Sequence, residues 1–242
     1  MLTVEGIPVE VVRKRVKNVN IRVYPPDGRV RVSAPLRSGD GAVRRAIVSR
    51  LDWIRRKRRS VEGAVRPPRP ALAAGEVHFV QGRGYVLDVV EGGGRHRVGV
   101  TGDARLELRV RPGTDMAGRW RALDRFYREL LERRVPELLA RWQPRMRVAA
   151  AEWRIKSMKT RWGTCNVRAR RIWLNVDLAR RPERCLEYVV VHELVHLLER
   201  NHSKRFYALM DEFLPDWRAR REELNGAWPV DTPPPGSSRL DC

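Results

Sequence analysis

Cysteine is scarce in this chain of 242 residues, and long apolar runs are absent. The three cysteines, Cys165, Cys185 and Cys242, form no C-x-x-C pair, which excludes a zinc ribbon and argues against a disulfide framework. No segment approaches the roughly 20 apolar residues of a membrane span, and the first residues lack the apolar core of a signal peptide. We therefore expect a protein of a reducing, cytoplasmic compartment, with no membrane partner.

Acidic residues are few relative to basic ones. The chain has 50 Lys and Arg against 29 Asp and Glu, a formal net charge of +21 at pH 7, and only six of the cations are lysine. A basic surface attracts nucleic acid or another acidic partner. A GC-rich genome would also raise arginine, together with alanine, glycine and proline. We favour the compositional explanation and keep nucleic-acid binding through a basic surface as the alternative.

The length allows one large domain or two small ones with a sizeable core. We expect a β-rich N-terminal region over residues 1–113, a second region over 114–228, and a disordered tail over 229–242, which is rich in proline, serine and glycine. No internal sequence repeat is visible.

The pattern along the chain predicts strands first and helices later. An Arg-rich helix is predicted near 40–60, with Asp40 as its N-cap. We interpret its arginines as a solvent-exposed face, with contact to a polyanion as the alternative. A helix over 115–142 contains Pro136, which should kink or divide it. A β-rich stretch over 148–178 follows, then helices from Pro182 to Arg200 and over 204–224. The predicted strands are 7–12, 19–24, 30–34, 77–81, 84–90, 95–100 and 105–110.

The segment from His192 to His196 reads HELVH, and His202 follows, so three of the five histidines fall within eleven residues. Two histidines four positions apart on a helix project from the same face. Zinc binds neutral imidazole nitrogens at roughly 2.0–2.1 Å, and Glu193 could act as general base on a zinc-bound water. The surrounding valines and leucines predict a buried helix, where an unpartnered histidine or glutamate would be costly. The spacing predicts one Zn²⁺ per chain, bound by His192 and His196.

The third ligand needs a break in the helix. Six steps of 100° would turn His202 about 240° away from His196 on an unbroken helix, off the metal face. We therefore expect the helix to end near Arg200 and the chain to reverse at Asn201, with Ser203 capping the next helix. Asp211 or Glu212 on the last helix is the alternative third ligand.

The stretch 158–213 resembles the YgjP-like zinc metallopeptidase family, which belongs with the zincin-like peptidases and is akin to the WLM and SprT-like families. Arg161–Cys165, RWGTC, is similar to the family's RWGSC block. Ile172, Leu174 and Asn175 resemble its following strand. His192–Phe206 is similar to its HELxHLxxxNHSxxF block nearly letter for letter.

The resemblance implies an α+β, zincin-like metallopeptidase core over 114–228, with the active-site helix packed on a small antiparallel sheet and the β-rich region with one helix preceding it. It also implies that His192, His196 and His202 are the metal ligands and that Glu193 is the catalytic glutamate. The implied activity is metal-dependent hydrolysis of peptide bonds.

The sequence therefore predicts a zinc metallopeptidase acting on a protein or peptide. The alternative is a nucleic-acid-associated module with a structural zinc site, or a protease acting on nucleic-acid-bound proteins. Arg161, Trp162, Gly163 and Tyr207 are the candidate substrate-binding residues, with Arg161, Tyr207 and Tyr188 as candidate oxyanion donors. In the competing interpretation, Trp162 is core and Gly163 a bulge.

Overall fold

The computed structural model describes residues 1–24, 27–61, 71–158 and 160–226, and the predicted tail over 229–242 lies outside them. The chain divides into two compact units, Met1–Pro67 and Pro68–Cys242. The sequence-based boundary at 113/114 falls inside the second unit. The reason is a shared hydrophobic core, in which Leu87 and Leu106 of the strands lie with Leu123 and Leu131 of the following helix.

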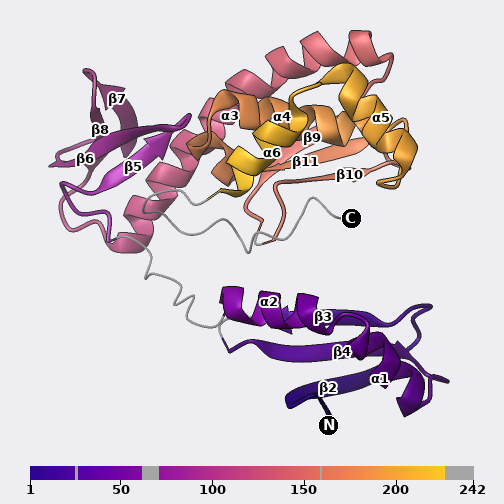
Figure 1. The fold of residues 1–242 in the computed structure, drawn as a ribbon. Coiled ribbons are helices and arrows are strands. Elements are labelled where there is room, and N and C mark those ends of the chain that lie inside the picture. Colours follow the sequence, from indigo (N-terminus) through magenta and orange to yellow (C-terminus); the bar gives the residue numbers. More distant parts are fainter. Residues whose placement is uncertain (25–26, 62–70, 159, 227–242) are drawn as a thin grey trace. The chain divides into compact units, whose positions relative to one another are not determined.

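The first unit is a four-stranded sheet with two helices (Figure 1). Its strands are β1 (Leu2–Val4), β2 (Ile7–Lys14), β3 (Asn20–Tyr24) and β4 (Arg29–Pro35), in the order β1-β2-β4-β3, with β2 and β4 parallel. Val30 and Val32 alternate with more exposed residues, so they face one side of the sheet. The core on that side is completed by Val43, Ile47 and Ile54 of the helices.

The predicted Arg-rich helix over 40–60 is two helices, α1 (Asp40–Val48) and α2 (Leu51–Val61). Gly39, not Asp40, is the N-cap of α1. The break lies at Ser49, whose hydroxyl donates to the carbonyl of Ala46 at 3.0 Å, and the amide of Arg50 bonds Ile47 O three residues back. Such local bonds replace the regular helical pattern and end the helix.

The second unit begins with a sheet of the same topology as the first. Its strands are β5 (Val77–Val80), β6 (Arg83–Glu91), β7 (Arg97–Thr101) and β8 (Arg105–Val110), in the order β5-β6-β8-β7, with β6 and β8 parallel. The two sheets are therefore a structural repeat that is not visible in the sequence, because the same pairing of strands can be formed by different side chains.

The first turn of each sheet supports this correspondence. Glu5-Gly6 and Gln81-Gly82 both join their strands with two residues at positive φ, 48° and 75° in the first pair and 49° and 83° in the second. This is the backbone of a type I′ hairpin, for which glycine at the second position is well suited.

The long helix α3 (Met116–Met146) connects the second sheet to the rest of its unit (Figure 1). The side chain of Asp115 caps it by accepting from Gly118 N at 2.7 Å. The helix continues through Pro136 instead of dividing, because Val135 and Leu138 beside the proline are both buried in the core. The free energy gained by burying these side chains exceeds the cost of the one backbone hydrogen bond that Pro136 cannot make.

A second, smaller sheet consists of β9 (Glu152–Lys156), β10 (Gly163–Asn166) and β11 (Arg171–Asn175), in the order β10-β11-β9. It is mixed rather than antiparallel as predicted, since β11 pairs with β10 antiparallel and with β9 parallel. The parallel pairing is possible because β9 and β11 are joined through β10 rather than by a tight turn.

Four further helices follow: the 3₁₀ helix η1 (Val176–Arg180), α4 (Glu183–Val195), α5 (Lys204–Phe213) and α6 (Trp217–Asn225). The helix predicted over 204–224 is thus divided, because Leu214 before Pro215 has an extended φ of −140° that a helix does not allow. The fold is α+β, as predicted. Among the described residues, no helix has the length and apolar character needed to cross a membrane.

Candidate metal centre

The helix α4 carries two of the three histidines. His192 lies in its last turn and His196 is its C-cap, and the two ring centroids are 4.9 Å apart. The helix ends at Val195, earlier than the predicted Arg200. The chain then reverses, and Ser203 caps α5 by accepting from Phe206 N at 3.3 Å. This reversal is the break that the spacing of His196 and His202 required.

His202, in that reversal, lies beside both helix histidines. Its ring centroid is 5.0 Å from that of His192 and 4.9 Å from that of His196. The ligand atoms of the three residues all lie within 4.8 Å of one another, which makes them a candidate metal-binding group. The alternative ligand Asp211 is engaged elsewhere, because it accepts from Trp217 Nε1 at 2.8 Å and pairs with Arg218.

The environment favours the neutral form of the helix histidines. Burial, followed by the nearby imidazoles, holds the pKa of His192 well below 6.5. Burial likewise lowers the pKa of His196 to about 4. The carbonyl of Glu199 lies 3.2 Å from His196 Nδ1, and a carbonyl can only accept, so Nδ1 carries the proton and Nε2 keeps its lone pair. Neutral imidazole is the form that binds a metal.

Phe206 supports the three imidazoles from one side. Its buried ring has centroid distances of 4.9 Å to His192, 4.8 Å to His196 and 4.5 Å to His202. The sequence placed Phe206 only as part of the family block. Its spacing of four residues from His202 was an available signal, but contact with all three rings depends on the reversal between α4 and α5.

A cycle of aromatic rings links the first and third histidines through α6. Tyr207 stacks on His202 at 6.2 Å, Trp217 stacks on Tyr207 at 5.7 Å, and Tyr188 stacks on Trp217 at 6.4 Å. Tyr188 then meets His192 edge-on at 5.8 Å. Tyr207 and Tyr188, which the sequence offered as oxyanion donors, are therefore both engaged through their ring faces. Trp217 was not singled out by sequence reasoning.

Glu193 directly follows His192 on α4 and is enclosed by the protein. It is 1 % exposed, and its Oε2 has no hydrogen-bond partner among the described residues. Burial raises the pKa of Glu193 to about 8, and the positive charge of Arg161 acts in the other direction. An unpartnered buried carboxyl is costly, so its retention beside three histidines indicates a chemical role.

Gly163, at the start of β10, gives Glu193 its space. A Cβ built on Gly163 would lie 2.5 Å from Glu193 Oε1 and 2.9 Å from Val189 Cγ1. The sequence made Gly163 a candidate substrate-binding residue or a bulge. In the structure, side chains of α4 occupy the space that a side chain at position 163 would need, so β10 packs directly against α4 beside the carboxyl group.

Trp162 and Arg161 precede that glycine. Trp162 is buried, with its Nε1 donating to Asn225 Oδ1 at 3.2 Å and the guanidinium of Arg181 above its ring at 5.4 Å. Arg161 is exposed. The buried side chain of Asn175 holds the backbone here, because its Nδ2 donates to Arg161 O at 2.8 Å and to Met158 O at 3.0 Å.

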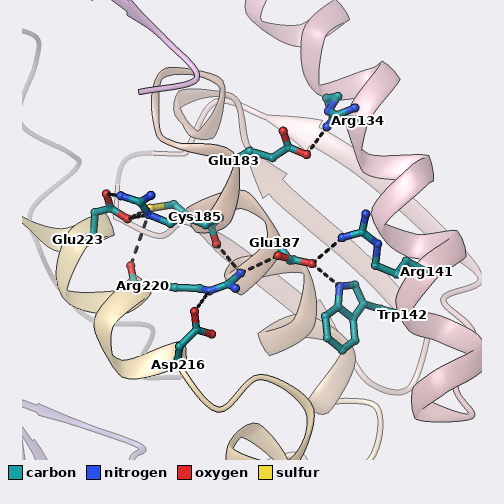
Figure 2. Close-up of polar contacts among 10 residues, drawn as sticks. Arg134, Arg141, Trp142, Glu183, Cys185, Glu187, Asp216, Arg220 and Glu223 are labelled. Carbon is teal, nitrogen blue, oxygen red and sulfur yellow. Dashed lines mark hydrogen bonds and ion pairs between the residues drawn. The ribbon is translucent and has the colours of Figure 1, made fainter. Parts of the chain in front are cut away.

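On the side of α4 that faces α3 and α6, a polar network fixes the helix (Figure 2). Glu187 accepts from Trp142 Nε1 at 3.0 Å and Arg141 Nη1 at 3.1 Å, both on α3, and from Arg220 Nη1 at 2.6 Å on α6. Arg220 also donates to Asp216 at 2.8 Å. Glu187 thus accepts from two arginines and an indole, and it ties α4 to both α3 and α6.

The donor set fits a metal ion. Three histidines gather on one side, two of them held neutral, and a carboxyl group with an unpartnered oxygen lies on the neighbouring residue of the same helix. Three ligands from the protein would leave one position open, as in catalytic metal sites and unlike closed structural ones. The arrangement is that expected of a catalytic metal centre.

Comparison with known proteins gives the family. The model of the YgjP-like metallopeptidase domain matches residues 17–227, so the chain belongs to the YgjP-like family of metallopeptidases. Among solved structures, the chain is similar to the metallopeptidase zymogen of Pyrococcus abyssi abylysin, with 20% identity and a TM-score of 0.35, over 37% of this chain and 90% of that one. No curated protein matches the chain.

Proposed function

We propose that the protein is a zinc-dependent peptidase in which His192, His196 and His202 bind the ion and Glu193 is the general base. The observation that carries this proposal is the group of three imidazoles next to a buried carboxyl group with a free oxygen. When bound, Zn²⁺ would lower the pKa of a water molecule to about 7 and polarise the carbonyl of the substrate.

The chain's own residues supply the proton transfers. Glu193 accepts a proton from the attacking water and delivers it to the amine of the leaving fragment. The backbone of Gly163 lies close to its carboxyl group and restricts its position, since a Cβ on that residue would lie 2.5 Å from Glu193 Oε1. A fixed base needs little reorganisation at the moment of reaction, which favours catalysis.

The strand β10 is suited to bind the substrate. It is an edge strand, since among the described residues it pairs only with β11. An extended peptide could add to its free edge by main-chain hydrogen bonds, as in other β-augmentation complexes. Arg161 precedes this strand and is exposed, so it is our candidate for the group that stabilises negative charge on the carbonyl oxygen.

A structural zinc site in a nucleic-acid-associated module is the competing function. Structural zinc sites have four protein ligands. Only three candidate ligands gather at the site among the described residues, and this supports the peptidase.

The test replaces Glu193 by glutamine, which has nearly the same shape. We expect Glu193→Gln to retain about one zinc per chain and to lose roughly 10²–10⁴-fold in kcat/KM, the usual contribution of a general base. The substrate would be an unfractionated, denatured proteome, digested with and without chelator, with this variant as the blank.

Two further variants complete the test. Glu212→Gln changes an exposed glutamate on α5 and should keep both zinc and activity. His202→Ala should lose zinc. Undiminished hydrolysis by Glu193→Gln would exclude the proposed base, and full zinc occupancy in His202→Ala would exclude the third ligand.

A further inference from the structure

The positive charge is concentrated in the first unit. Residues 1–67 contain 17 Lys and Arg against 6 Asp and Glu, a formal charge of +11, and the other 175 residues carry the remaining +10. The unit thus holds more than half of the excess in little more than a quarter of the chain. A GC-rich genome raises arginine throughout a chain and does not explain this distribution.

The helix α2 displays the densest part of this charge. Residues 55–59 read RRKRR, and Arg55, Arg56 and Arg59 are exposed while Ile54 packs into the core. Steps of 100° place these three arginines within about 100° of one another on the helix surface. They form one face, which we call the α2 arginine face.

Few acidic residues of the unit are near this face. Glu10 and Asp40 are already paired with Arg31 and Arg13, and α2 itself carries Asp52 in its first turn. Among the described residues, no ion pair involves Arg55, Arg56 or Arg59. Like charges four residues apart, as in Arg55 and Arg59, destabilise a helix, so the face carries a cost that a bound polyanion would remove.

We propose that the α2 arginine face binds the phosphate backbone of double-stranded nucleic acid without sequence preference. Guanidinium groups match phosphate geometry and make bidentate hydrogen bonds to it. The aromatic residue of α2, Trp53, is partly buried against the core of the unit, whereas single-strand binding relies on exposed aromatic rings that stack on bases. The proposal is independent of the peptidase function, because it concerns the other unit.

The test measures binding of a short, labelled DNA duplex of mixed sequence to the full chain by fluorescence anisotropy, over about 50–200 mM salt. The variant Arg55→Gln/Arg56→Gln/Arg59→Gln removes the face. A matched control, Arg95→Gln/Arg97→Gln/Arg168→Gln, removes three exposed arginines of the second unit and the same net charge. Circular dichroism and peptidase activity verify that both variants are folded.

Each phosphate contact contributes about 0.9 to the slope of log K against log salt. The α2 variant should therefore lose about 2–3 units of slope and on the order of a hundredfold in affinity at about 0.1 M salt. The control should stay close to the parent chain. Equal weakening of both variants, no measurable binding by the parent, or tighter binding to the single strand than to the duplex would each overturn the proposal.

Discussion

Replacing Gly163 by alanine adds one methyl group at the contact between β10 and α4. The new Cβ would lie 2.5 Å from Glu193 Oε1, whereas an ordinary contact begins at 3.4 Å. The carboxyl group must therefore retreat by about 0.9 Å, the difference between these two distances. The same Cβ would lie 2.9 Å from Cγ1 of Val189, which is fully buried, so the substitution crowds a second side chain of α4.

This displacement should act on catalysis more than on metal binding. Misplacing a catalytic group by about 1 Å typically costs on the order of 10² in rate, and overpacking a core costs about 1–3 kcal/mol in the free energy of unfolding. We expect Gly163→Ala to lose roughly a hundredfold in kcat/KM. Zinc affinity should stay near that of the parent chain, because the Cβ meets none of the three histidines among its nearest atoms.

The assay combines peptide hydrolysis, zinc affinity by competition with a chelator, and thermal unfolding. Gly99→Ala is the matched control, since Gly99 lies in the strand β7 and a Cβ there has no atom within 4 Å. Unchanged kcat/KM in Gly163→Ala would refute the positioning of Glu193 by this glycine. If Gly163→Ala lost as much zinc as His202→Ala, the substitution would not act on Glu193 alone, and this would refute the expectation that metal binding is spared.

Two further predictions concern the other face of α4. Trp217→Leu breaks the aromatic cycle and should weaken zinc binding by about 10–100-fold, as is typical for groups that hold a ligand in place. Trp120→Leu, which changes a tryptophan of similar burial away from the histidines, should destabilise the fold without this change in affinity; equal zinc affinities in the two variants would contradict the prediction. Burial alone would raise the pKa of Glu187, but hydrogen bonds from Arg220 and Trp142 outweigh it and the net pKa lies below 4.5. The ion pair therefore stabilises the fold above about pH 4.5 and is lost as the pH falls through the folded pKa, so Glu187→Gln should cost about 1.5–3 kcal/mol near pH 7 and progressively less in acid. Urea unfolding at several pH values measures this, and a cost independent of pH would count against it.

The sequence was sufficient to predict those site residues whose positions depend on local spacing. His192, Glu193 and His196 lie on one helix, so a 3.6-residue period places them without knowledge of the rest of the fold. His202 was assigned through the family resemblance, and the rotation per residue added that the helix had to break before it. The structure brings the three histidines together, with Glu193 next to His192 on α4.

Residues that act across elements were not predictable in the same way. Trp217 meets Tyr207 and Tyr188 only because α6 returns to α4, and Arg220 reaches Glu187 for the same reason. No local pattern encodes such a return. Helix ends were also misjudged where a single local bond decides them, as at Ser49, because helical periodicity continues on both sides of the break.

The hairpin at the start of the second sheet has a consequence for the origin of the active site. Gln81 N and Gly82 N bond the carbonyls of Ala179 and Arg180 at 2.8 Å and 3.1 Å, and a Cβ at Gly82 would lie 2.6 Å from Pro182 Cγ, the N-cap of α4. Gly6, in the matching hairpin of the first sheet, has no atom within 4 Å of such a Cβ. If both sheets derive from one ancestral module, the hairpin of the second sheet came to support the N-terminus of α4, whereas the hairpin of the first sheet makes no such close contact at Gly6. Replacing the Gln81-Gly82 turn by a different loop should then disturb metal binding, whereas the same replacement of Glu5-Gly6 should not.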